Sequence, residues 1–128
     1  EVPGASRVLV GTVVAYATRI KAQLLGVDAA HLERTGPVDR DVALQMADGV
    51  RRLLGADLGL ATTGVAGPGP ADGHPAGTVH VAVVAPWGQR HRELHLSGDR
   101  SQIRCATVME VCELAIGFLQ KDECGPQP

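Results

Sequence analysis

The fold of this chain is most constrained by residues 40–54, which carry the local signals of an amphipathic helix. Asp39 is a preferred residue at a helix N-cap, and Gly55 follows at the position where many helices end. Apolar side chains recur at helical spacing at Val42, Met46, Val50, Leu53 and Leu54. Such a helix buries its apolar side against another layer, so the chain should fold as a layered domain with a core.

Four segments are predicted to form strands. Residues 8–16 (VLVGTVVAY) are continuously apolar, which is typical of a strand buried on both faces. Residues 58–63 form a second short apolar run. Residues 78–85 alternate between apolar and other side chains, and the turn ProTrpGly joins them to residues 89–96, which predicts an antiparallel hairpin.

Further helices are predicted on either side of these strands. Residues 17–25 have helical spacing and end at Gly26, and Asp28 begins another short helical turn. Asp99 should cap a last helix, with Gln102 in the capping-box position. Helices mixed with strands in this way predict an α/β layered domain.

Composition restricts the domain organisation and the class of partner. The 128 residues are 45% hydrophobic, which predicts a single domain over residues 1–121 and a flexible tail over residues 122–128. Twelve basic residues against 14 acidic ones, with one Trp, one Tyr and one Phe, argue against nucleic-acid binding. The chain begins at Glu1 in mid-pattern, so we expect the domain to be incomplete at its amino end.

Hydropathy and the cysteines bear on localisation. No apolar run reaches the roughly 18 residues of a membrane helix, and no leader opens the sequence, so we expect a cytoplasmic protein without membrane contact. Cys105 and Cys112 would lie about 10 Å apart on a helix, too far for a disulfide bond. Reduced thiols agree with the cytoplasmic expectation.

Three features could carry chemistry. The loop over residues 64–77 is rich in Gly and Pro, so its backbone N–H groups could hold an anion, or it could simply turn the chain. Tyr16 and Lys21 follow a predicted strand, where a desolvated lysine could act as a base or lie on the surface. Arg100 and Arg104 share one helix face and could bind a phosphate or pair with nearby acids.

The histidines and serines give weaker signals. His91 and His95 are four residues apart on a strand, about 13 Å between Cα atoms, so they cannot share an ion unaided. His80 could approach one of them across the hairpin, but no acidic cluster completes a site, and we predict no metal. Ser97 and Ser101 stand in no known nucleophile motif.

Four segments, taken in order, closely resemble the carboxyl-terminal domain of the CinA (competence-damage-inducible) family. They are GTVVAYATRIKAQLLGV (11–27), VDRDVALQMADGVRRLLGADLGLATTGVAGP (38–68), PAGTVHVAV (75–83) and SGDRSQIR (97–104). The resemblance implies a three-layer α/β/α domain with a mixed sheet. It also implies a nicotinamide mononucleotide deamidase, which hydrolyses the carboxamide to nicotinate mononucleotide and ammonia in pyridine nucleotide salvage, without metal or other cofactor.

The same resemblance implies roles for individual residues. In the family a serine in an upstream ESCTGG-like motif is the nucleophile, and the lysine five residues after a tyrosine is its base; Tyr16 and Lys21 match these two positions. Arg100 matches the SGDR arginine, which should face the substrate phosphate. The substrate-binding loop is matched by Thr63, Gly64, Ala66 and Gly67.

The nucleophile motif of the family would precede Glu1, so three interpretations stay open. The chain is an incomplete deamidase domain, a noncatalytic interaction or oligomerisation module of a CinA-type protein, or a domain that binds a phosphate ligand without hydrolysis. The expected partner is a small nucleotide, and formation of a homo-oligomer is left open.

Overall fold

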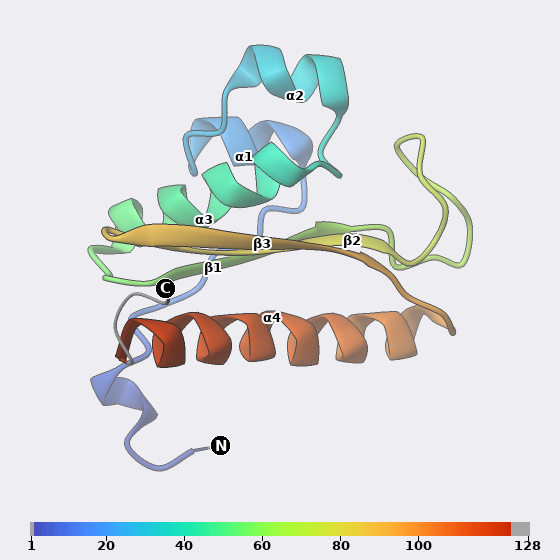
Figure 1. The fold of residues 1–128 in the computed structure, drawn as a ribbon. Helices are drawn as coiled ribbons and strands as arrows, with labels where there is room; N and C mark the ends of the chain where they lie inside the picture. Colours follow the sequence, from blue (N-terminus) through green and yellow to red (C-terminus); the bar gives the residue numbers. More distant parts are fainter. Residues whose placement is uncertain (1, 124–128) are drawn as a thin grey trace.

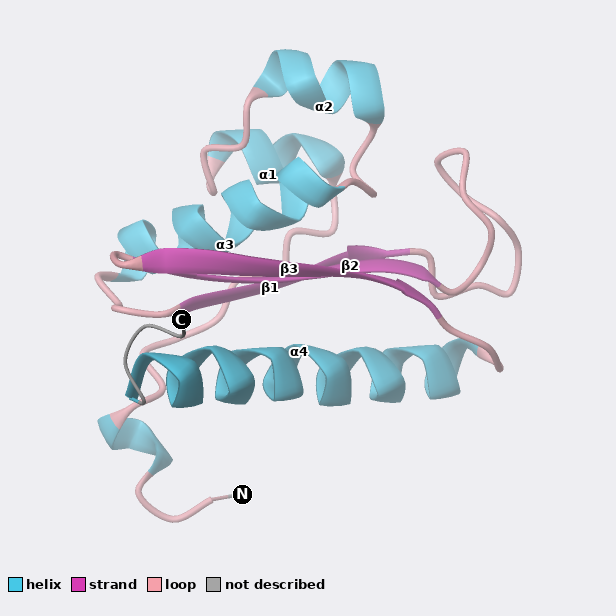
Figure 2. Ribbon diagram, in the orientation of Figure 1, coloured by secondary structure: helices cyan, strands magenta, loops and turns pink. Residues whose placement is uncertain are grey.

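A computed structural model describes the backbone of residues 2–123 and the side chains of residues 2–120. A three-stranded antiparallel sheet lies between helices on its two faces (Figure 1; Figure 2). In chain order the elements are the 3-10 helix η1 (Ala5–Arg7), α1 (Thr18–Gln23), α2 (Ala29–Thr35), α3 (Arg40–Leu54), β1 (Gly59–Gly64), β2 (Thr78–Ala85), β3 (Gly88–His95) and α4 (Arg100–Glu123).

The layers follow from the central position of β2. The strand order is β1-β2-β3, with α3 on one face and α4 on the other, while α1 and α2 lie beyond α3 (Figure 1). Every residue of β2 is buried because both of its faces are covered. The α/β fold is thus confirmed. The expected mixed sheet is corrected: among the described residues both strand pairings are antiparallel.

The helix caps form as the sequence predicts. The carboxylate of Asp39 accepts hydrogen bonds from the backbone N–H groups of Asp41 and Val42, and Gly55 ends α3 with φ of 66°. At α4, the Asp99 carboxylate accepts from the Gln102 N–H at 2.9 Å, and the Gln102 side chain accepts from the Asp99 N–H at 2.8 Å. These local signals therefore place both long helices correctly.

Two apolar clusters hold the layers together. Between α3 and the sheet, Val42 and Ala47 pack against Ala82 and neighbouring buried residues. On the opposite face, the α4 side chains Ile103, Val111, Leu114 and Phe118 pack against Val79, Val81, Val83 and Leu94. The alternation of β2 therefore divides its side chains between two cores, as the sequence pattern predicts.

The prediction of a buried strand over residues 8–16 is wrong. This segment belongs to no strand, and Val8, Val14 and Tyr16 are exposed by 81%, 87% and 93%. A strand needs a hydrogen-bonded neighbour, and no described strand pairs with this segment. The apolar composition of residues 8–16 therefore favours burial, but the described part of the chain leaves much of this segment exposed.

Three smaller expectations have separate outcomes. Cys105 and Cys112 are free, as their spacing predicts. Of the predicted tail over residues 122–128, only the backbone of residues 122 and 123 is described, where it forms the end of α4; the rest lies outside the described residues. Within the described part of the chain, no helix combines the length and apolarity needed to cross a membrane.

Candidate functional site

Five of the seven residues that the sequence assigns to a site line one cavity, here called the site cavity. Its volume is about 670 Å³, and it lies between α1, the end of β1 and the first turns of α4. The assigned residues that line it are Tyr16, Lys21, Thr63, Gly64 and Ala66. Chain segments far apart in the sequence thus converge on one volume, as a ligand site requires.

Lys21 is the most unusual side chain of the site cavity. It lies in the last turn of α1 and is only 8% exposed, and its Nζ donates a hydrogen bond to the carbonyl oxygen of Ala15 at 3.0 Å. Burial lowers the pKa of this amine, and the negative charge of Asp72 opposes the shift in part. A lysine whose pKa is lowered can hold an unprotonated, basic nitrogen nearer to neutral pH.

Tyr16 reaches the same cavity in a different way. It lines the wall, yet 93% of it is exposed, because the extended segment before α1 has no layer beyond it. The site cavity is therefore open to solvent on the side where Tyr16 lies.

The end of β1 supplies backbone and hydroxyl groups. Thr63 is buried, and its hydroxyl donates to the carbonyl oxygen of Pro37 at 2.7 Å, which ties β1 to the segment before α3. A Cβ on Gly64 would lie 2.7 Å from the carbonyl oxygen of Thr78, so only glycine allows β1 to approach β2 this closely. Gly64 and Val79 both line the site cavity, where these two strands meet.

Gly67 and Arg100 are brought together, but away from the cavity wall. Nη1 of Arg100 donates to the carbonyl oxygen of Gly67 at 3.0 Å, across 33 positions of sequence. Gly67 has φ of 89°, a conformation open chiefly to glycine. Neither residue is among those that line the site cavity, so Arg100 holds the loop instead of facing the cavity.

Of the α4 wall, sequence reasoning weighed only Arg104 as a ligand residue and missed the others. The residues of α4 that line the site cavity are Ser101, Ile103, Arg104, Cys105, Thr107 and Val108. Ser101, Arg104 and Thr107 are spaced by three, so they share one face of the helix. That spacing is visible in the sequence, but only the tertiary structure shows which face of α4 meets the end of β1.

A second cavity, here called the edge cavity, begins where the site cavity ends. It has a volume of about 530 Å³ and separates the extended residues 8–15 from β1. Thr62 lines both cavities. The outer edge of β1 faces this space without a paired strand among the described residues.

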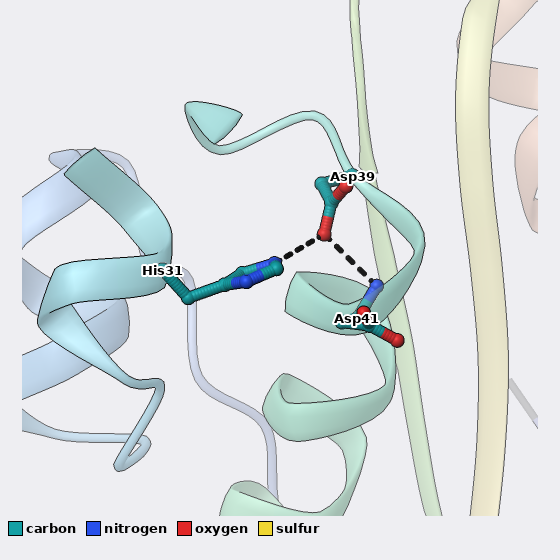
Figure 3. A group of neighbouring side chains, drawn as sticks. All are labelled: His31, Asp39 and Asp41. Carbon is teal, nitrogen blue, oxygen red and sulfur yellow. Dashed lines mark hydrogen bonds and ion pairs between the residues drawn. The ribbon is translucent and has the colours of Figure 1, made fainter. Parts of the chain in front are cut away.

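His31, Asp39 and Asp41 form the one group of potential metal ligands within the described residues (Figure 3). The same Asp39 oxygen accepts from His31 Nε2 at 2.7 Å, from the Asp41 N–H at 3.0 Å and from the Val42 N–H at 3.2 Å. Three N–H donors already occupy that oxygen, so Asp39 serves as the N-cap of α3, and His31 supports it through a side-chain hydrogen bond.

His80 and His91 meet across the hairpin, as one alternative from the sequence allowed. Nδ1 of His80 and Nε2 of His91 lie 2.9 Å apart in a hydrogen bond, and the two rings stack. Burial lowers the pKa of both imidazoles, while the carboxylate of Glu93 opposes the shift. Two neutral imidazoles fit this contact, because the protonated nitrogen of one ring can donate to the unprotonated nitrogen of the other.

Comparison with known proteins identifies the family. Residues 1–119 match the CinA C-terminal domain. A competence-damage inducible protein of Desulforamulus reducens is 48% identical over 120 residues, which cover 94% of this chain and 29% of that protein. A CinA-like protein of Frankia casuarinae is 47% identical over 114 residues, 89% of this chain and 26% of that protein. The chain thus spans less than a third of the length of these curated relatives.

Solved structures agree with this assignment. The competence/damage inducible protein CihA from Agrobacterium tumefaciens superposes with a TM-score of 0.77 at 38% identity, covering 81% of this chain and 65% of that one. A CinA superfamily protein from Escherichia coli gives a TM-score of 0.70 at 34% identity, covering 74% of this chain and 56% of that one. On these sequence and structural matches, the chain belongs to the family of CinA C-terminal domains.

Proposed function

We propose that this domain forms the base, loop and ligand-binding parts of an amidase site that hydrolyses the carboxamide of nicotinamide mononucleotide. The observation that carries the proposal is Lys21: a buried amine of lowered pKa on the wall of a cavity large enough for a nucleotide. Amide hydrolysis needs a base of this kind to activate a nucleophile and to protonate the leaving nitrogen.

The edge cavity supports a place for the nucleophile. Residues 8–15 and β1 form its two sides, and both runs end at the site cavity, where Tyr16 and Gly64 lie. A strand that paired in parallel with β1 in this space would end beside Thr62, on the side of the site cavity that Lys21 lines. In the family resemblance a serine follows such an upstream segment, so its hydroxyl would meet the base there.

The reaction then balances without a cofactor. The serine oxygen attacks the carboxamide carbon, and Lys21 Nζ accepts the hydroxyl proton. Backbone N–H groups of the loop after β1 would stabilise the oxyanion. The C–N bond breaks, ammonia leaves with the proton from Lys21, and water hydrolyses the acyl-enzyme to nicotinate mononucleotide. This activity would place the protein in cytoplasmic pyridine nucleotide salvage.

Ammonia release tests the proposal. The 128-residue chain should release no ammonia from nicotinamide mononucleotide, because none of its serines stands in the nucleophile position. A chain extended by the upstream segment of a relative, with its ESCTGG-like motif, should release ammonia in a coupled assay. If the extended chain folds and binds the nucleotide but stays inactive, the amidase proposal is wrong.

A second candidate, an oligomerisation module, has one observation in its favour. The outward side of α4 carries exposed apolar residues: Met109 (61%), Ile116 (55%) and Leu119 (38%). A helix that is apolar on both sides is usually covered on both sides. Sedimentation velocity would detect self-association, and the double variant Met109→Lys/Ile116→Lys should abolish it.

A further inference from the structure

The α4 wall of the site cavity has the chemistry of an anion site. Ser101 and Arg104 line it with a hydroxyl and a guanidinium group, while the hydroxyl of Thr107 already donates to the carbonyl oxygen of Ile103 at 2.7 Å. On the opposing side, α1 contributes the amine of Lys21. Among the described residues that line this cavity, none is an Asp or a Glu. A cavity wall that carries a guanidinium group and a serine hydroxyl, and no carboxylate, favours an anionic ligand.

Arg104 is exposed and differs in its contacts from Arg100, which lies one helical turn earlier on α4 and donates to the Gly67 carbonyl oxygen. Glu110, an acid on the same helix, pairs with Arg92 at 2.8 Å, and Arg51 pairs with Asp48 at 2.8 Å. In the described part of the chain Arg104 makes no side-chain hydrogen bond or ion pair, although it lies on the cavity wall. Its five N–H donors are therefore free to bind a ligand.

Arg100 has the opposite character. Its Nη1 donates to the Gly67 carbonyl oxygen at 3.0 Å, and it does not line the cavity. It fixes the loop that follows β1, next to the cavity residues Gly64 and Ala66. Arg100 therefore acts on a ligand only through the position of this loop.

We infer that Arg104 is the residue that recognises a phosphate monoester in the site cavity, and that Arg100 is a positioning residue for the loop. A phosphate dianion offers several acceptor oxygens, which suit a guanidinium group with the Ser101 hydroxyl on the same helix face. Since α1 and α4 lie on opposite sides of the sheet (Figure 1), the phosphate at Arg104 and the reacting group at Lys21 occupy different walls. The identity of the nucleotide rests on the proposed function; the anion site rests on the cavity alone.

Calorimetric binding by the 128-residue chain tests the inference with three probes: nicotinamide mononucleotide, nicotinamide riboside and inorganic phosphate. Arg104→Gln should weaken mononucleotide binding about ten- to hundredfold, the range for lost charge-assisted hydrogen bonds, and leave riboside binding unchanged. Arg104→Lys should lose less, because it keeps the charge. Arg100→Gln should weaken binding of the mononucleotide and the riboside to the same extent.

Arg19→Gln is the matched control, since it removes the same charge from the exposed face of α1 and should leave all affinities unchanged. Circular dichroism checks that each variant is folded. The inference is overturned if the parent chain binds no phosphate-bearing probe, if Arg104→Gln affects both organic ligands equally or neither, or if only Arg100→Gln discriminates against phosphate. Arg104-dependent phosphate binding combined with an inactive extended chain would instead support the anion site and reject the amidase.

Discussion

Lys21 Nζ lies 3.0 Å from the carbonyl oxygen of Ala15, so the buried amine is held by the extended segment that precedes its own helix. Among the described residues this is the only hydrogen bond that the amine makes. One acceptor leaves two of the three ammonium protons without a protein partner, which disfavours the charged form in a buried position. Lys21 also lines the site cavity, so this contact joins the end of residues 8–15 to the site.

Substitution of Lys21 tests its role as the base. In a chain extended by the upstream nucleophile segment, Lys21→Met should lower turnover of nicotinamide mononucleotide at least about a hundredfold, the usual contribution of a general base. Nucleotide affinity should change much less, which calorimetry would check. Turnover close to that of the extended parent would show that Lys21 has only a structural role.

The buried amine also makes stability depend on alkaline pH. Because folding lowers the pKa of Lys21 below 10.5, the unfolded chain binds more protons between the folded-state pKa and 10.5. The free energy of unfolding should therefore rise with pH through that interval. Urea unfolding at a series of pH values measures the rise, and Lys21→Met should remove it. Arg19→Met, on the same helix, should leave it intact; persistence of the rise in Lys21→Met would assign it to another group.

Asp39 should stabilise the amino end of α3. Asp39→Ala should lower the free energy of unfolding by about 1 kcal/mol, the typical value of a lost N-cap. Burial alone would raise the pKa of Asp39, but hydrogen bonds from His31 and from the first turn of α3 outweigh it and lower the pKa. Its stabilisation is thus present above the unfolded-state pKa and lost as pH falls through the folded-state value.

Urea unfolding at neutral and acid pH measures both the loss of stability in Asp39→Ala and the pH dependence of the stabilisation by Asp39. The exposed Asp57→Ala, beyond the end of α3, serves as control and should change stability by less than about 0.5 kcal/mol. An Asp39→Ala variant as stable as this control would show that the cap contributes nothing measurable.

The pair of His80 and His91 should make the fold sensitive to mild acid. Folding lowers both pKa values below 6.5, mainly by burial, so the unfolded chain binds more protons as pH falls through this region. The free energy of unfolding should have its full value above about pH 6.5 and decrease below it. Thermal unfolding from pH 7.5 to 5.5 should show this loss, and His91→Gln should reduce it. His95→Gln, on the same strand and exposed, should not; equal losses in both variants would exclude the pair as the cause.

The sequence by itself determined the elements whose signals are local. Asp39 marks the beginning of α3 and Gly55 its end, because a cap acts on the N–H and C=O groups of the adjoining turn. Asp99 and Gln102 mark the beginning of α4 for the same reason. The turn after Ala85 joins β2 and β3 into the antiparallel hairpin that the sequence predicts. Each of these interactions spans few residues, so the sequence pattern contains all the partners.

Only the tertiary structure decided the state of residues 8–16 and the division between Arg100 and Arg104. The apolar run predicts burial, but a strand also needs a partner strand, and pairing depends on chain that is distant in sequence. The two arginines are one helical turn apart, and either could face an anion on spacing alone. The carbonyl oxygen of Gly67, 33 residues before Arg100, accepts a hydrogen bond from the Arg100 side chain, whereas Arg104 lies on the cavity wall. Such contacts arise from packing between separate layers, which no local pattern of residues encodes.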